Sequence, residues 1–181
     1  MFEKSFDLLI NEGIILEKGL TLSELQQIER VYQIEFPQSL RNFLMDRVPV
    51  SKGFYNWRNF RVENVEYIKK IIKMPFDGIY NLADEVYWCD DWGNEPNDKE
   101  IYLHTVREKL MSAPTLLPIY SHRYIPMVSD INPPVFSIHG VDIIIYGADL
   151  EDYINIEFGR KKQTDIQFEM VPYIDFWSDI M

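Results

Sequence analysis

The chain has 181 residues, a length typical of one domain, and 46% of them are hydrophobic, which is enough to bury a full core. Its 29 acidic and 18 basic side chains give a formal net charge of -11. Such a field repels nucleic-acid phosphates and anionic lipid and attracts basic partners. We therefore expect a single domain over 1–181 that binds neither nucleic acid nor membranes. A negative surface also serves solubility alone, so the charge permits a basic partner without requiring one.

The cysteine content and the apolar runs bear on the compartment. The one cysteine, Cys89, excludes an internal disulfide framework. The N-terminal residues lack the basic and apolar regions of a secretion signal, and the longest apolar runs are too short to cross a membrane. A cytoplasmic location is the simplest expectation.

The first part of the chain carries helical patterns. Apolar residues recur at helical spacing over 2–12. Thr21 and Glu24 form a capping box ahead of an apolar stripe, which predicts a helix over 21–34. A proline in the first turn and further apolar residues at helical spacing predict another helix over 37–49.

Two more helices are expected in the middle of the chain. The stretch 64–72 is amphipathic, and we expect 75–78, which begins with a proline and ends with a glycine, to close it. A polar helix is predicted over 97–111, with Asp98 near its start and Lys109 near its end, as the helix dipole favours.

The pattern changes to short β-prone runs after residue 114. These runs are separated by turn residues, so neighbouring strands can pair antiparallel: 116–120, 124–128, 135–138 and 143–146. A last helix is predicted from Asp149 to Phe158, where Gly159 stops it. Helices segregated from a meandering sheet predict an α+β fold. The final stretch 160–181 ends in a run too aromatic for a disordered tail, and we expect it to pack onto the body.

An ordered series of landmarks runs through the chain, and no one of them is specific alone. They are Leu22-Ser23-Glu24-Leu25 through Ile28-Glu29, Phe36-Pro37 with Leu40 and Phe43-Leu44, Pro75 with Asp77-Gly78, Trp88, Asp91-Trp92-Gly93, Pro96, Leu117 to Pro126, Pro134 to Ser137, and Asp142 to Gly147. The series resembles the SUKH superfamily, which unites the fungal Smi and Knr cell-wall regulators with bacterial immunity proteins that neutralise polymorphic toxins. The resemblance covers about 21–158.

The resemblance implies an antiparallel sheet flanked by helices, a Smi/Knr-like single domain, and a protein-binding role without a recognised set of catalytic residues. In bacterial members it implies binding and blocking a toxin. A family shared by regulators and immunity proteins fixes the fold better than the function. Residues 159–181 have no obvious counterpart in the family core and form a C-terminal extension.

A candidate partner-binding surface lies over residues 88–95. Two tryptophans are interleaved there with three acids, which combines aromatic contact area with charges that steer a basic partner: Trp88, Asp90, Asp91, Trp92 and Glu95. The alternative is that the tryptophans, four residues apart, are core side chains and the acids alone meet a partner. A second acidic set extends the field if the helices bring it together, namely Asp84, Glu85, Asp98 and Glu100.

Other side chains are assigned structural roles. Arg123 follows a turn and is expected to order the sheet by pairing with a carboxylate such as Asp142. We do not expect Cys89, which lies beside two acids, or Ser137, which lacks a glycine-framed elbow, to act as a nucleophile.

Metal and cofactor chemistry is not indicated. Three histidines and Asp142 are donors that suit zinc, but His104, His122 and His139 are irregularly spaced, and turn histidines more often bond backbone. We predict no metal site. No glycine-rich phosphate loop is present, so no nucleotide cofactor is expected.

Three functions remain open at this point. The leading hypothesis is a non-enzymatic, cytoplasmic immunity-type protein whose acidic face, including Asp90, Asp91 and Glu95, masks the active site of a basic toxin, for example a nuclease. The runner-up is a regulatory or scaffold protein of the same fold with a housekeeping partner. The third is a small metal-dependent hydrolase that uses His122 and His139.

Overall fold

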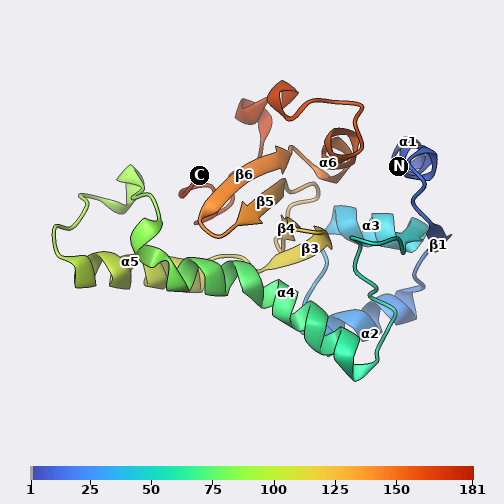
Figure 1. Ribbon diagram of the computed structural model, residues 1–181, viewed down its shortest axis with the longest axis horizontal. Helices are drawn as coiled ribbons and strands as arrows, with labels where there is room; N and C mark the ends of the chain where they lie inside the picture. Colours follow the sequence, from blue (N-terminus) through green and yellow to red (C-terminus); the bar gives the residue numbers. More distant parts are fainter. Residues whose placement is uncertain (1) are drawn as a thin grey trace.

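The computed structural model describes residues 2–181 and has the α+β architecture that the sequence predicts (Figure 1). The helices are α1 (Glu3–Asn11), α2 (Leu22–Tyr32), α3 (Gln38–Asp46), α4 (Val62–Asn81), α5 (Lys99–Ser112) and α6 (Leu150–Glu157). The strands are β1 (Leu16–Lys18), β2 (Arg47–Pro49), β3 (Leu116–Tyr120), β4 (Arg123–Pro126), β5 (Val135–His139) and β6 (Asp142–Gly147). Short 3-10 turns are η1 (Ala83–Glu85), η2 (Asp90–Trp92), η3 (Gln163–Asp165) and η4 (Phe168–Met170).

The main sheet is the predicted antiparallel meander in the order β3-β4-β5-β6. Its register pairs Tyr124 with Phe136 and Phe136 with Ile145, so one face of three strands carries apolar side chains toward α4 and α5. The sequence missed a smaller sheet, in which β1 pairs antiparallel with β2. These two strands are three residues each, too short to give an alternating pattern.

The capping box at the start of α2 is confirmed. The Thr21 hydroxyl accepts a hydrogen bond from the Glu24 amide at 3.2 Å, and the Glu24 carboxylate accepts one from the Thr21 amide at 2.8 Å. Leu25, Ile28 and Tyr32 then form the buried stripe of the helix. Local chemistry alone starts this helix where the sequence predicts it.

The prediction that residues 75–78 close α4 is wrong, because the helix continues through Pro75 and Gly78 to Asn81. Proline has no amide hydrogen, so it leaves the carbonyl of Ile71 without its helical donor. The Tyr124 hydroxyl lies 3.5 Å from that oxygen and donates to it. Pro75 and Ile79 are both buried against the rest of the protein. Tertiary packing therefore outweighs the local tendency of proline to end the helix.

The C-terminal stretch is packed into the core, as the sequence predicts. Ile174, Phe176, Trp177 and Ile180 are buried in the same apolar cluster as the inner face of the sheet. The Trp177 indole N–H donates to the carbonyl of Pro114 at 2.8 Å. Within 2–181, no helix has both the length and the hydropathy that a membrane span requires.

Candidate protein-binding surface

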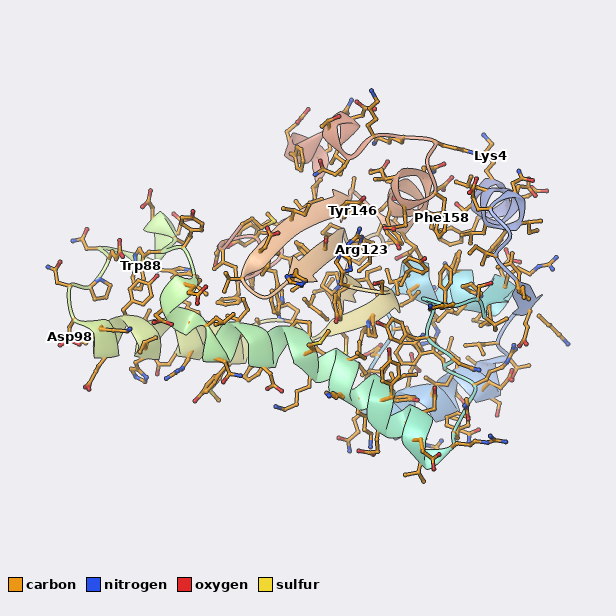
Figure 2. The ribbon with its side chains drawn as sticks, in the orientation of Figure 1. Lys4, Trp88, Asp98, Arg123, Tyr146 and Phe158 are labelled. Atoms are coloured by element: carbon orange, nitrogen blue, oxygen red, sulfur yellow. The ribbon has the colours of Figure 1, made fainter. Side chains whose placement is uncertain are left out.

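The segment between α4 and α5 projects from one end of the molecule, opposite α1 (Figure 1). We call residues 82–100 the acidic loop. All of its carboxylate side chains are exposed, and they come from η1, η2, the connection after η2 and the start of α5: Asp84, Glu85, Asp90, Asp91, Glu95, Asp98 and Glu100. Figure 2 shows Asp98 at the tip and Trp88 behind it. Lys99 is the single basic residue in this stretch.

The structure brings the members of the second predicted acidic set together, because η1 lies against the start of α5. The Lys99 ammonium donates to the Asp84 carboxylate at 2.9 Å, which ties η1 to the first turn of α5. This hydrogen bond lowers the pKa of Asp84 below its usual value. Asp98 caps α5 by accepting from the amides of Glu100 and Ile101. These acids are thus held on a folded loop.

The tryptophans of the loop turn inward, so the geometry favours the alternative in which the acids alone face outward. Trp88 and Trp92 are half-buried and meet edge to face, with ring centroids 5.5 Å apart. Trp88 also packs against Tyr102 of α5 at 5.2 Å. The Trp88 indole donates to the carbonyl of Gly93 at 2.7 Å, which closes the turn after η2. Gly93 has a φ of 90°, a conformation that favours glycine there.

Sequence reasoning missed the residues that hold Trp92 in place. The Trp92 indole donates to the Asp179 carboxylate at 3.0 Å, and its ring stacks on Phe176 at 6.0 Å. The hydrogen bond links positions 87 residues apart in the chain. The aromatic density of the last ten residues predicted that they pack, but it gave no indication of which element they pack against.

Arg123 has the structural role that the sequence predicts, but with a different partner. Its guanidinium donates to Glu157 of α6 at 2.9 Å and to the Ser137 hydroxyl at 2.8 Å, and it lies 3.9 Å from the centre of the Tyr146 ring (Figure 2). Asp142 is exposed at the β5–β6 turn, so the pairing with Asp142 is wrong. Glu157 reaches Arg123 because α6 packs on the sheet, and sequence spacing does not show that approach. Ser137 is thereby engaged as an acceptor.

Two of the three histidines converge. His122 and His139 line one cavity of about 280 Å³ together with Met74 and Tyr124. Burial lowers the pKa of His122, and the neighbouring Arg123 lowers it further. His104 lies apart on α5, where it is exposed beside Glu108. Among residues 2–181, no cluster of three or more His, Cys, Asp or Glu side chains is placed to hold a metal ion.

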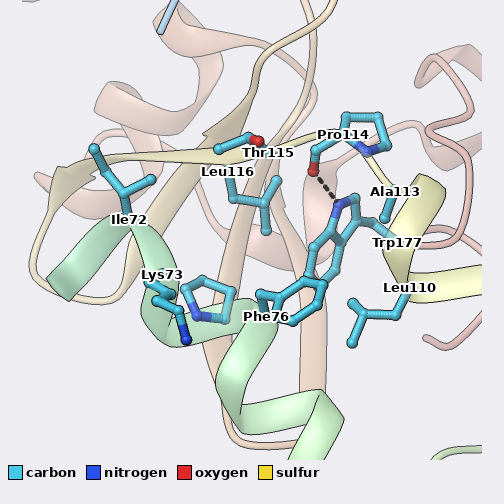
Figure 3. Close-up of a pocket in the computed structure, with 10 residues that line it drawn as sticks. Ile72, Lys73, Phe76, Leu110, Ala113, Pro114, Thr115, Leu116 and Trp177 are labelled. Atoms are coloured by element: carbon cyan, nitrogen blue, oxygen red, sulfur yellow. Dashed lines mark hydrogen bonds between the residues drawn. The ribbon is translucent and has the colours of Figure 1, made fainter. Parts of the chain in front are cut away.

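Another cavity, of about 300 Å³, lies between α4, α5, β3 and the C-terminal stretch (Figure 3). Phe76, Leu110 and Trp177 form apolar walls, and the Trp177 indole is already bonded to the Pro114 carbonyl. Lys73 stands at its edge and pairs with Asp77. Of the polar side chains at the cavity, the ammonium of Lys73 and the indole of Trp177 are already engaged within the chain, which leaves Thr115 to orient a ligand.

Comparisons of the chain with protein-family models, with curated proteins and with solved structures gave no match. The acidic loop carries seven exposed carboxylates within residues 82–100.

Proposed function

We propose that the chain is a non-catalytic, cytoplasmic protein-binding domain of the SUKH type that uses its acidic loop to bind and neutralise a basic toxin domain. The observation that carries this proposal is the set of exposed carboxylates on residues 82–100, opposed by Lys99 alone. The order of landmarks from Thr21 to Phe158 and the antiparallel meander support the choice of family.

The physics of the loop suits recognition of a basic surface. Carboxylates on a folded loop attract a positive partner from a distance and favour one orientation of approach. Because the tryptophan pair and the Asp98 cap already fix the backbone, little conformational entropy is lost on binding. A basic nuclease, whose active site must itself attract phosphates, is one class of toxin with the complementary charge.

The test is co-expression with the products of the genes adjacent to the one that encodes this chain. We expect one of them to be toxic alone, to be tolerated in the presence of this chain, and to co-elute with it in size-exclusion chromatography. If this chain suppresses the toxicity of none of these products and forms a complex with none of them, the proposed function is wrong. A complex with a product that is not toxic would point instead to a regulatory partner.

A matched set of variants tests the surface. Asp90→Asn, Asp91→Asn and Glu95→Gln together should slow association at least tenfold at low salt and weaken its salt dependence. The control carries the same charge change at the opposite end of the molecule, on and beside α1: Glu3→Gln, Asp7→Asn and Glu12→Gln. Equal effects of the two sets would show that net charge matters and that the loop does not.

A further inference from the structure

The C-terminal segment, residues 171–181, forms one surface with the acidic loop. Trp92 of the loop bonds to Asp179 and stacks on the buried ring of Phe176, so the two stretches are joined by direct side-chain contacts. Tyr173 bonds to Asp179 as well, so Asp179 joins Tyr173 to Trp92 of the loop. The part of the chain that has no counterpart in the family core therefore borders the proposed binding surface.

A strained turn sets which side chains of this segment point outward. Phe176 has a φ of 65°, which is rare for a large side chain, and the amide of Trp177 donates to the carbonyl of Asp175 at 2.8 Å across it. The turn buries Phe176 and Trp177. Asp175 is left exposed beside Tyr173. The burial of two aromatic rings compensates for a backbone strain of about 1–3 kcal/mol.

Two tyrosine rings stand out on this surface. Tyr87 is 79% exposed and Tyr173 is 61% exposed. Along the chain, exposed Asp90 and Asp91 lie three and four residues after Tyr87, and exposed Asp175 lies two residues after Tyr173. An exposed aromatic ring with a neighbouring carboxylate suits a guanidinium, which stacks on the ring and bonds the acid at the same time.

The same chain shows this arrangement in its interior. The guanidinium of Arg123 lies over the Tyr146 ring at 3.9 Å while it donates to Glu157 at 2.9 Å. A lysine ammonium carries a similar charge, but it is more strongly hydrated and lacks the flat face that stacks on a ring.

We propose that Tyr87 and Tyr173, with the carboxylates of Asp90, Asp91 and Asp175, form a docking surface for arginine side chains of a protein partner, and that it prefers arginine to lysine. This inference rests on the proposed function for its biological meaning, but the binding chemistry stands apart from any toxin. It also gives the C-terminal segment a role, since that segment supplies Tyr173 and Asp175 and fixes Trp92.

The test uses two synthetic peptides, Gly-Arg-Gly-Arg-Gly-Arg-Gly and its lysine counterpart, titrated into the full-length ¹⁵N-labelled chain at low salt. We expect shifts of the Trp88 and Trp92 indole signals and of amides in 87–92 and 173–179. The arginine peptide should bind about 2- to 5-fold more tightly than the lysine peptide. Equal affinities, or shifts spread evenly over the exposed acids of α1, would overturn the proposal.

Variants locate the preference on the rings. The pair Tyr87→Leu and Tyr173→Leu should abolish the difference between the two peptides, whereas Tyr173→Phe, which keeps the ring, should retain it. Tyr67→Leu, at a tyrosine 54% exposed on α4, is the control and should also retain it. If the pair does not fold, Tyr87→Leu alone should at least halve the preference. A preference that persists in a folded variant without the rings refutes the inference.

Failure of this inference and failure of the proposed function are distinguishable. Because the peptides replace the cellular partner, arginine selectivity is measured whether or not a toxin exists. If a toxin complex forms and the tyrosine variants do not change its affinity, the proposed function is supported and the arginine-docking inference is wrong.

Discussion

The ion pair between Arg123 and Glu157 offers a quantitative test of how the sheet and α6 are held together. The two side chains are 10% and 18% exposed, so solvent screens them little. Replacing Arg123 with Met leaves the Glu157 carboxylate without its partner and also removes the bond to Ser137 and the contact with the Tyr146 ring. We expect this variant to lose about 3–5 kcal/mol of unfolding free energy.

A double-mutant cycle separates the pair from its surroundings. Arg123→Met with Glu157→Met removes both charges, so the double variant should be more stable than the sum of the single losses predicts, by about 2 kcal/mol. Urea titrations followed by tryptophan fluorescence measure all four corners. The control is Lys69 with Glu66, at 3.8 Å and 47% and 67% exposed, whose coupling should be below about 0.5 kcal/mol. If the losses for Arg123 and Glu157 add within about 0.5 kcal/mol, the pair is not coupled and the reasoning is refuted.

Three further predictions concern the fold. A hydrogen bond from the Thr21 amide is the largest cause that lowers the pKa of Glu24 from 4.5 to about 2. The contribution of Glu24 to the unfolding free energy is therefore present above pH 4.5 and lost as the pH falls toward 2. In paired urea titrations, Glu24→Ala should cost about 1 kcal/mol at pH 7 and nothing measurable at pH 2. Gly19→Ala would place a methyl group 1.9 Å from a backbone oxygen and should prevent folding. Gly78 lies in a helix with its nearest neighbour at 4.0 Å, so Gly78→Ala should raise stability by about 0.5–1 kcal/mol. Thermal melts in which the Gly19 variant is the more stable of the two would contradict this account of the packing. A chain truncated after Phe158 loses about 10 kcal/mol of apolar burial, on the order of the whole stability of a domain, and should show no cooperative unfolding transition by circular dichroism.

What the sequence predicts well is what short-range chemistry decides. The capping box of α2 needs contacts within three residues, and the hairpins of the main sheet join strands that are neighbours in the chain. The continuation of α4 through Pro75 depends instead on Tyr124, which lies 53 residues from the carbonyl it reaches. The partner of Arg123 is set in the same way by the packing of α6. Neither contact leaves a periodic signal in the sequence.

The candidate surface likewise has features that the sequence predicts and features that depend on long-range packing. That residues 84–100 carry an acidic field is a property of composition, and the exposed positions of those acids follow from their hydration. The inward direction of Trp88 and Trp92 depends on Tyr102 and on the C-terminal segment. The sequence therefore left two readings of the tryptophans open, because an aromatic residue four positions from another suits a core and an interface equally well.

The two parts of the surface differ in what they contribute to folding, and this decides how its function can be tested. Trp92 and Phe176 belong to the packing that joins the loop to the body, so their substitution changes stability and binding together. Asp90, Asp91 and Tyr87 are exposed and make no side-chain hydrogen bond or ion pair in the described residues, so neutral or apolar replacements there leave the fold intact. A loss of binding in those variants therefore reports recognition itself, since the buried aromatic residues still hold the loop in its native conformation.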